Sequence, residues 1–131
     1  MLSDSKHAAT PLEEGRVLFI SDGAIGGEYT TYLQRYGFAV TAAPAFKTGL
    51  QLVLRAPFDI VILDIGESTP AGLRVARLLR GYLRMRRTPI ICLCASAGAA
   101  TIEAGANLAL DHFCTPADLA QTIDVFLRRR K

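Results

Sequence analysis

The segment Ile60-Val61-Ile62-Leu63-Asp64 decides the fold of this 131-residue chain. Its first four residues are apolar and mostly β-branched, which is typical of a strand buried on both faces. The run stops at the carboxylate of Asp64, and a loop over residues 65–70 is expected to follow. The segment therefore predicts a central strand that presents one acidic group at its C-terminal end.

Similar apolar runs lie on both sides of this segment, and amphipathic segments separate them. The further strands are predicted at 17–20, 38–42, 89–94 and 111–114. The helices are predicted at about 25–36, 45–55, 71–84 and 99–110, with a last one from Pro116. This alternation indicates an α/β fold, a doubly wound five-stranded parallel sheet with helices on both faces.

Length and composition indicate a single folded domain. A chain of 131 residues, half of them apolar, can form one hydrophobic core. Residues 1–14 are polar and are expected to be a flexible N-terminal segment, so the domain covers 15–131. No apolar run is long enough to cross a bilayer, and the N-terminus lacks a secretory signal pattern. We therefore expect a cytoplasmic protein with no membrane partner.

Acidic residues follow two of the predicted strands. Asp22 comes after the first strand and Asp64 after the third, and ligands of such sheets lie at the C-terminal strand ends. Two neighbouring carboxylates repel each other unless a cation lies between them, and Mg²⁺ takes oxygen ligands of this kind. The alternative is that both acids cap the helices that follow. The spacing alone leaves the two interpretations open.

The order and spacing of these features resemble the receiver domain of two-component response regulators, over about residues 16–129. Ser21 and Asp22 align with the pair of acids that ends the first strand in that family. Asp64 aligns with the aspartate that accepts a phosphoryl group, and Gly72 and Pro89 also match. The resemblance implies a flavodoxin-like fold with strand order 2-1-3-4-5.

The resemblance also implies a site and partners. Asp64 is the candidate phosphoacceptor, and Asp22, Asp64 and the backbone carbonyl of Gly66 are candidate ligands of a weakly bound Mg²⁺. A histidine kinase or another signalling protein is the implied partner, and the domain is not expected to be an enzyme. Partners of receivers commonly dock on the face formed here by the last two helices and the last strand, so a homodimer through that face is also expected.

Three polar positions depart from the family pattern. Ser21 replaces an acid, Cys94 replaces a hydroxyl residue, and Thr115 replaces a lysine. Cys94, His112 and Thr115 occupy the positions expected to read out phosphorylation. The chain has three cysteines, Cys92, Cys94 and Cys114, and their spacing is not that of a zinc site. Because the count is odd, we expect free thiols rather than a disulfide or a metal site.

Three functions remain open on this basis. The favoured one is an atypical, degenerate receiver that acts through protein–protein interaction with weak or no phosphorylation. The alternative is a phosphorylation-competent receiver that accepts a phosphoryl group on Asp64 from a histidine kinase. An unrelated function, such as nucleotide or nucleic-acid binding, is the least favoured, and nucleic acid is not expected to bind this domain alone.

Arginines recur at helical spacing in the segment 71–84, at positions 74, 77, 80 and 84. An apolar stripe opposes them, and it consists of Leu73, Ala76, Leu79 and Leu83. We expect the arginines to form a solvated helix face over a buried apolar side. The alternative is a docking surface for an acidic partner or nucleic acid.

Overall fold

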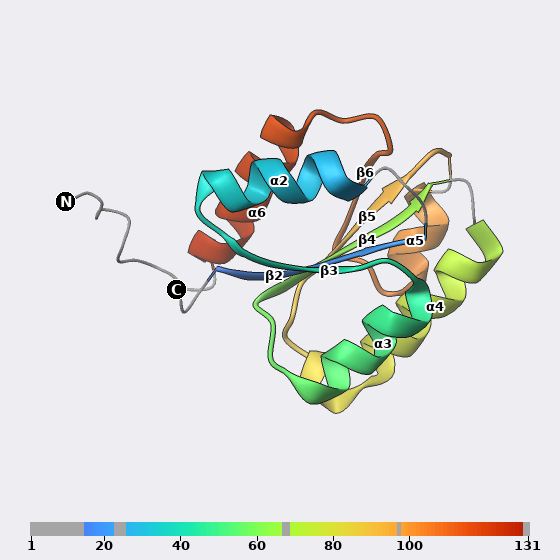
Figure 1. Ribbon diagram of the computed structural model, residues 1–131. Helices are drawn as coiled ribbons and strands as arrows, with labels where there is room; N and C mark the ends of the chain where they lie inside the picture. Colours follow the sequence, from blue (N-terminus) through green and yellow to red (C-terminus); the bar gives the residue numbers. More distant parts are fainter. Residues whose placement is uncertain (1–14, 23–25, 67–68, 97, 130–131) are drawn as a thin grey trace.

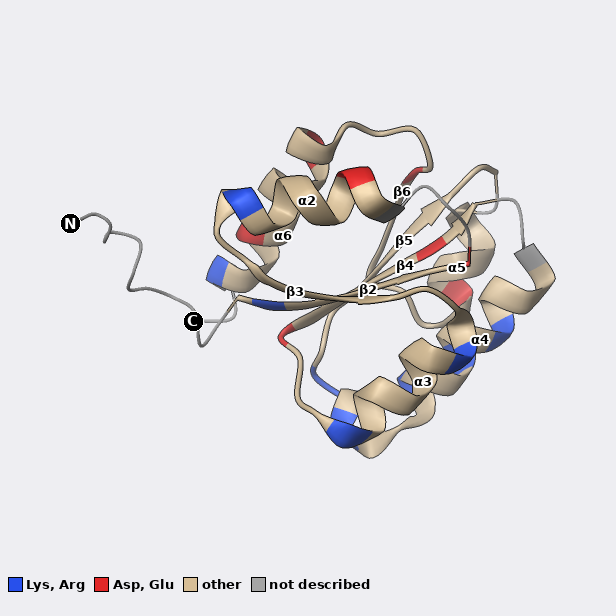
Figure 2. Ribbon diagram, viewed as in Figure 1, with Lys and Arg blue, Asp and Glu red and all other residues tan. Residues whose placement is uncertain are grey.

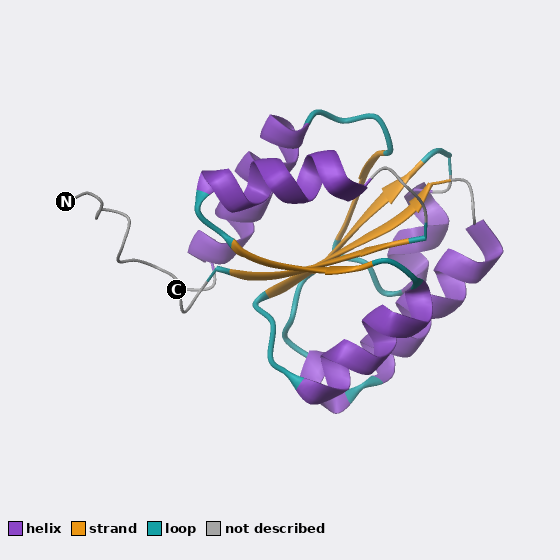
Figure 3. Cartoon of the chain, viewed as in Figure 1, coloured by secondary structure: helices purple, strands orange, loops and turns teal. Residues whose placement is uncertain are grey.

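The computed structural model describes residues 15–129 except 23–25, 67–68 and 97, so the expected flexible segment 1–14 lies outside the described residues. The strands are β2 (Arg16–Ser21), β3 (Ala39–Ala43), β4 (Ile60–Gly66), β5 (Ile90–Cys94) and β6 (Leu108–Asp111). The helices are α2 (Gly26–Tyr36), α3 (Phe46–Arg55), α4 (Thr69–Gly81), α5 (Gly98–Ala104) and α6 (Pro116–Arg129), with a short 3-10 helix η2 (Leu83–Met85). Figure 3 shows the resulting alternation of helices and strands.

The strands form one parallel sheet in the order β3-β2-β4-β5-β6. Numbered by their occurrence along the described chain, this is the predicted order 2-1-3-4-5. Helices α3, α4 and α5 cover one face of the sheet, and α2 and α6 cover the other (Figure 1). The predicted doubly wound fold is therefore confirmed. None of the described helices has the length and apolar character needed to cross a membrane.

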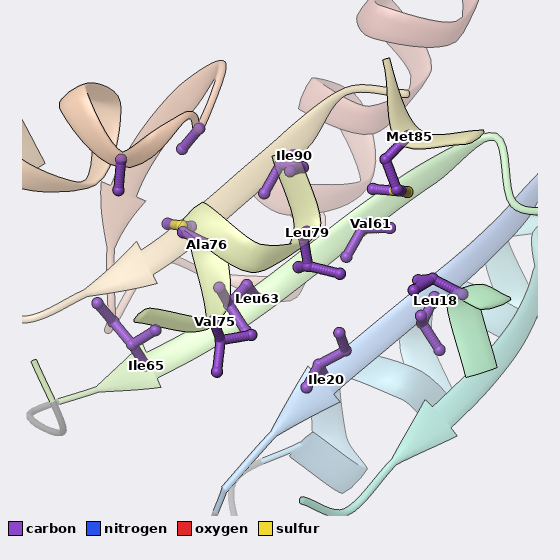
Figure 4. Close-up of a cluster of buried hydrophobic side chains, with 14 of the residues drawn as sticks. Leu18, Ile20, Val61, Leu63, Ile65, Val75, Ala76, Leu79, Met85 and Ile90 are labelled. Carbon is purple, nitrogen blue, oxygen red and sulfur yellow. The ribbon is translucent and has the colours of Figure 1, made fainter. Parts of the chain in front are cut away.

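The sheet has a buried apolar layer on each face. Because side chains alternate along a strand, Val61, Leu63 and Ile65 of β4 face the α3–α4 side, where Figure 4 shows them beside Val75 and Leu79. The intervening β4 residues, Ile60 and Ile62, belong to the opposite cluster, which contains α2 and α6 residues. Asp64 continues this second set, so its carboxylate lies on the α2–α6 side.

The start of α4 packs closely on the end of β4. A Cβ added at Gly72 would lie 2.2 Å from Cγ2 of Ile65, a distance that real atoms do not tolerate. A larger residue would therefore push α4 away from the strand. This contact gives a packing reason for the glycine that the sequence comparison had aligned only by spacing.

Three element boundaries differ from the sequence predictions. Strand β4 runs on through Asp64 to Gly66, so the predicted loop from Ile65 begins too early. Helix α5 ends at Ala104 rather than near residue 110, because Gly105 adopts a φ of +122° and Ala106 N–H bonds back to the Thr101 carbonyl. The early helix end lets the last strand occupy 108–111 instead of 111–114.

The end of the arginine-rich helix also differs from the prediction. Helix α4 stops at Gly81 and the chain continues as η2, so the helical periodicity does not extend to Leu83 and Arg84. Leu83 is 78% exposed and is not part of the buried stripe, whereas Ala76 and Leu79 are fully buried as predicted. The guanidinium of Arg84 donates to the Val53 carbonyl of α3 at 3.2 Å.

Arg80 is a structural residue rather than part of a solvated face. Its guanidinium donates to the backbone carbonyls of Gly105, Met85 and Thr88 at 2.7–3.0 Å. A fourth bond goes to the side-chain oxygen of Asn107, which also accepts the Ile90 N–H. Burial lowers the pKa of the Arg80 guanidinium from its usual range. The side chain therefore connects α4 to the two loops that precede β5 and β6.

Replacing Arg80 by alanine is expected to destabilise the fold by about 2–3 kcal/mol, because several half-buried carbonyls lose a charged donor. The measurement is urea denaturation followed by circular dichroism. Arg77→Ala is the matched control, since Arg77 is exposed on the same helix, and its effect should stay within about 0.5 kcal/mol. Equal effects of the two substitutions would contradict the structural role of Arg80.

Candidate functional site

The candidate site lies at the C-terminal ends of the two central strands. Strands β2 and β4 are neighbours, and their register pairs Ser21 with Asp64. Asp22 follows directly after β2 and is exposed to solvent, whereas Asp64 is only 5% exposed. The predicted proximity of these strand ends is confirmed, with the serine, rather than the acid, directly opposite Asp64.

The carboxylate of Asp64 accepts two hydrogen bonds on the same oxygen, Oδ1. The backbone N–H of Gly66 donates at 3.1 Å, and Nδ1 of the His112 imidazole lies 3.2 Å away. Gly66 reaches this position with a φ of +50°, a conformation that glycine adopts without strain. Burial raises the pKa of Asp64, and the charge and hydrogen bond of His112 and the Gly66 N–H oppose that rise only in part. The site therefore contains a buried acid that already has partners.

His112 is the site residue whose placement the sequence did not predict. It was assigned to the fifth strand, but it follows β6, and its backbone N–H bonds to the Cys94 carbonyl at 3.0 Å. Its side chain is 11% exposed and covers Asp64 from the β6–α6 loop. The C-terminal ends of parallel strands meet at one edge of the sheet. With the last strand at 108–111, this rule places His112 near Asp64, whereas the predicted strand at 111–114 does not.

Tyr29 of α2 also contacts the loop that carries His112. Its hydroxyl donates to the backbone carbonyls of His112 and Cys114. The ring is 4% exposed and stacks on Phe19 of β2 with ring centroids 5.8 Å apart. Burial raises the pKa of the Tyr29 hydroxyl, so it stays a proton donor. The sequence placed Tyr29 on a helix but gave no sign of this role.

The two remaining readout positions have other local roles. Thr115 lies four residues after β6, and its hydroxyl accepts the Asp118 N–H at 3.0 Å at the start of α6. This is the bond of a helix N-cap, and Thr115 is exposed. Cys94 ends β5 as predicted, is 6% exposed, and lies with its Sγ 3.9 Å from the Leu110 carbonyl.

The candidate metal ligands are oxygen donors, as Mg²⁺ requires, but they are few. Mg²⁺ prefers carboxylate and carbonyl oxygens, which Asp22, Asp64 and Gly66 offer. The Gly66 carbonyl also accepts the Ala95 N–H at 3.0 Å. Within the described part of the chain, no three His, Cys, Asp or Glu side chains are grouped so that they could hold a metal ion. The donor set fits a hard divalent ion that keeps several of its waters.

The cysteines are free thiols, as expected. Cys92 and Cys94 are buried in β5, and Cys114 is partly buried in the β6–α6 loop. Burial raises the pKa of Cys92 to about 12, so this thiol is not ionised near neutral pH. No redox role follows from these positions.

Comparison with known proteins agrees with the fold. No protein-family model matches the sequence. The similar curated proteins include the transcriptional regulatory protein CseB of Streptomyces avermitilis, 33% identical over 122 residues, and the transcriptional regulatory protein QseB of Haemophilus influenzae, 30% identical over 123. These alignments cover 89% and 88% of this chain, but 51% and 53% of the relatives. The chain thus spans about half the length of the curated relatives it matches.

Solved structures show the same architecture. The receiver domain of the Francisella response regulator 1452 superposes with a TM-score of 0.78 at 21% sequence identity, covering 89% of this chain and 99% of that one. This similarity establishes the fold, and the curated relatives add similarity in sequence to transcriptional regulatory proteins. In fold the chain resembles the receiver domains of response regulators, and in sequence it is similar to transcriptional regulatory proteins over about half of their length.

Proposed function

We propose that this chain is an atypical receiver that acts mainly through protein–protein interaction, with weak or no phosphorylation of Asp64. The observation that carries the proposal is the state of Asp64. It is 5% exposed, and the side chain of His112 lies 3.2 Å from its Oδ1. The position that offers an ammonium group in the family is Thr115, whose hydroxyl instead caps α6.

Phosphoryl transfer to an aspartate depends on neutralising the charge that develops on the phosphoryl oxygens. Thr115 is neutral, and losing a charge-assisted contact costs about 1.5–3 kcal/mol, one to two orders of magnitude in an equilibrium. Ser21 removes one negative charge from the ligand set of the metal. Asp22, Asp64 and the Gly66 carbonyl would hold a Mg²⁺ ion, which supplies part of this neutralisation when it is bound.

The readout of a phosphoryl group would also be weak. In a receiver, a hydroxyl residue at the end of the fourth strand closes onto the phosphoryl group and couples it to a change of shape. Cys94 stands at that position, and its thiol is a weak donor. A ligand shifts a conformational equilibrium only by its differential interaction with the two states. Poor contacts from Cys94 therefore favour a domain whose shape depends little on phosphorylation.

The alternative function is a receiver that still accepts a phosphoryl group from a histidine kinase on Asp64. One observation favours it. The Nδ1–H group of His112 donates to the Asp64 carboxylate, so it is also placed to donate to an oxygen attached to that carboxylate. His112 would then supply in part the hydrogen bond that the lysine supplies in the family.

The partners that fit both functions are signalling proteins, including a histidine kinase. The α5–β6–α6 face stays the expected docking or homodimer surface, and it has exposed apolar side chains. These are Ile102, Phe113 and Val125, at 46%, 79% and 46% exposure. Because the curated relatives are transcriptional regulatory proteins, we place the domain upstream of an output of that kind.

Incubation with Mg²⁺ and a small phosphoryl donor such as acetyl phosphate tests the proposal. We expect less than about a tenth of the protein to carry a phosphoryl adduct by intact mass, since about 1.5–3 kcal/mol of stabilisation is missing. Thr115→Lys should raise the fraction, because the ammonium group restores a charged donor at the family position.

Asp64→Asn is the control, and it should abolish any adduct that depends on this site. Circular dichroism would check that Thr115→Lys, which removes the cap of α6, still folds. A stoichiometric adduct on the unaltered protein that disappears in Asp64→Asn would contradict the proposal and support the phosphorylation-competent alternative.

The buried charge of Asp64 predicts a pH-dependent cost to stability. Because burial raises the pKa of this carboxyl above its unfolded value, the cost is absent at pH below the unfolded pKa. It appears as the pH rises through the pKa of the folded state. Asp64→Asn should therefore raise the melting temperature at pH 8, and should raise it by less near pH 4.

Thermal melts across this pH range measure the effect, with Asp22→Asn as the control, because Asp22 is exposed at the neighbouring strand end. We expect the control to change little at any pH. A gain for Asp64→Asn that is the same at pH 4 and pH 8 would show that burial of the charge is not its cause.

A further inference from the structure

The surface formed by α3, α4 and η2 is strongly polarised in charge. Residues 46–58 and 69–89 contain eight of the 15 Lys and Arg residues of the chain and none of its 12 Asp and Glu residues. Figure 2 shows basic residues and no acidic ones on α3 and α4. This surface lies away from the candidate site, on the sheet face opposite α2 and α6.

Most of these cations are available to a partner. Arg80 and Arg84 donate to backbone carbonyls of their own fold. The remaining six are exposed: Lys47, Arg55, Arg74, Arg77, Arg86 and Arg87. The nearest acid in sequence, Asp59, accepts the backbone N–H of Arg16 at 2.9 Å and lies 3.9 Å from its guanidinium. The exposed arginines therefore face solvent without a carboxylate in their own helices.

Apolar side chains are interspersed among these cations. Leu54 of α3, Leu78 of α4 and Leu83 of η2 are 54%, 50% and 78% exposed. Leu78 follows Arg77 directly, and Leu83 lies between α4 and the pair Arg86-Arg87. Contiguous exposed apolar patches rimmed by polar residues mark interaction sites, and these three leucines add apolar area among the cations of this surface.

A pocket of about 200 Å³ opens beside the arginines, where the end of α3 meets η2. Apolar residues, including Val53, Phe58 and Met85, line it together with the polar residues Arg84 and Thr88. An apolar cavity of about 150 Å³ can hold a benzene-sized group. The pocket is therefore of the size for one leucine or phenylalanine side chain of a partner.

We propose that the α3–α4–η2 surface, with this pocket, binds an acidic segment of another protein that inserts one apolar side chain. The arginines complement carboxylates, and the leucines and the pocket complement the apolar residues of an amphipathic segment. A nucleic acid backbone would use the cations but leave the leucines and the pocket without a role. A lipid surface would use the protruding leucines but cannot fill a concave pocket with one side chain.

Because the surface combines cations with apolar groups, it predicts how binding of the acidic segment depends on salt. Exposed ion pairs are screened by salt, whereas burial of an apolar side chain is not. Binding should therefore weaken with salt but remain measurable at high salt. Since the surface lies outside the site of Asp64, this binding does not depend on whether the proposed atypical function is correct.

The test uses the unaltered protein and a fluorescein-labelled synthetic peptide with glutamates on one helical face and leucines on the other. Fluorescence anisotropy should show saturable binding. Replacing the glutamates by glutamine, or the leucines by serine, should each weaken it about tenfold, because each change removes one half of the complementarity.

Charge reversal then locates the site. Arg77→Glu combined with Arg87→Glu should weaken binding of the peptide about tenfold. The matched control combines Arg35→Glu with Arg128→Glu, which changes the net charge equally. Since these two residues lie on the exposed faces of α2 and α6, the control should change binding less than about twofold.

A separate variant tests the pocket. Ala56→Leu, which narrows the pocket, should weaken binding of the leucine peptide and leave binding of the serine peptide unchanged. Thermal melts verify that each variant is folded.

Several results would overturn the proposal. No saturable binding up to about 1 mM peptide, which corresponds to about 4 kcal/mol, would exclude a specific site. Equal weakening by the two charge reversals would show an effect of net charge alone. Tighter binding of a DNA duplex, or of phosphatidylglycerol vesicles, than of the peptide through the same arginines would assign the surface to that partner instead.

Discussion

Strand β4 is buried on both faces at the centre of the sheet, and the position of Asp64 depends on that burial. Its apolar side chains are completely or almost completely inaccessible from Ile60 to Ile65, and they contribute alternately to the two hydrophobic clusters. Because the alternation also places Asp64, the strand cannot keep its core residues without holding this carboxylate inside the fold on the α2–α6 side. The packing of the core and the placement of the acid are therefore one constraint.

A buried carboxylate costs stability unless donors surround it, and here the donors come from the fold itself. Gly66 contributes its backbone N–H from the same strand, and His112 contributes its imidazole from the loop after β6. The hydroxyl of Tyr29 donates to two backbone carbonyls of that loop. Together these contacts describe a site that is preorganised around the carboxylate. This preorganisation is the physical basis of the atypical receiver function that we propose.

The charged groups of the molecule are distributed unevenly between its two helical layers. In the layer of α3, α4 and α5, Arg80 has a structural role, because its four hydrogen bonds join α4 to two loops. The arginines around it stay exposed and are mixed with leucines and a pocket. The site of Asp64 and this basic surface are separated by the sheet. The interaction surface that we propose therefore does not involve the site of Asp64.

The strand order was predicted from the resemblance to receiver domains. The sequence by itself determined the parallel sheet and the acid at the end of its central strand. Those features follow from local hydrophobic periodicity and from general rules of α/β connection, which the runs 17–20 and 60–63 express without help from distant residues. Tertiary structure alone decided where the short C-terminal elements begin and end. Gly105 ended α5 early and moved the last strand, and both changes placed His112 beyond that strand.

The roles of single side chains also differ from the predicted ones, because these roles depend on contacts between elements that are distant in the sequence. Helical spacing placed Arg80 among the surface arginines, because a periodic pattern carries no information on which carbonyls of other elements lie within reach. The pairing of His112 with Asp64 joins residues 48 positions apart in the chain. Such a contact depends on the packing of α2, β4 and the β6–α6 loop against each other, and only the folded chain brings these segments together.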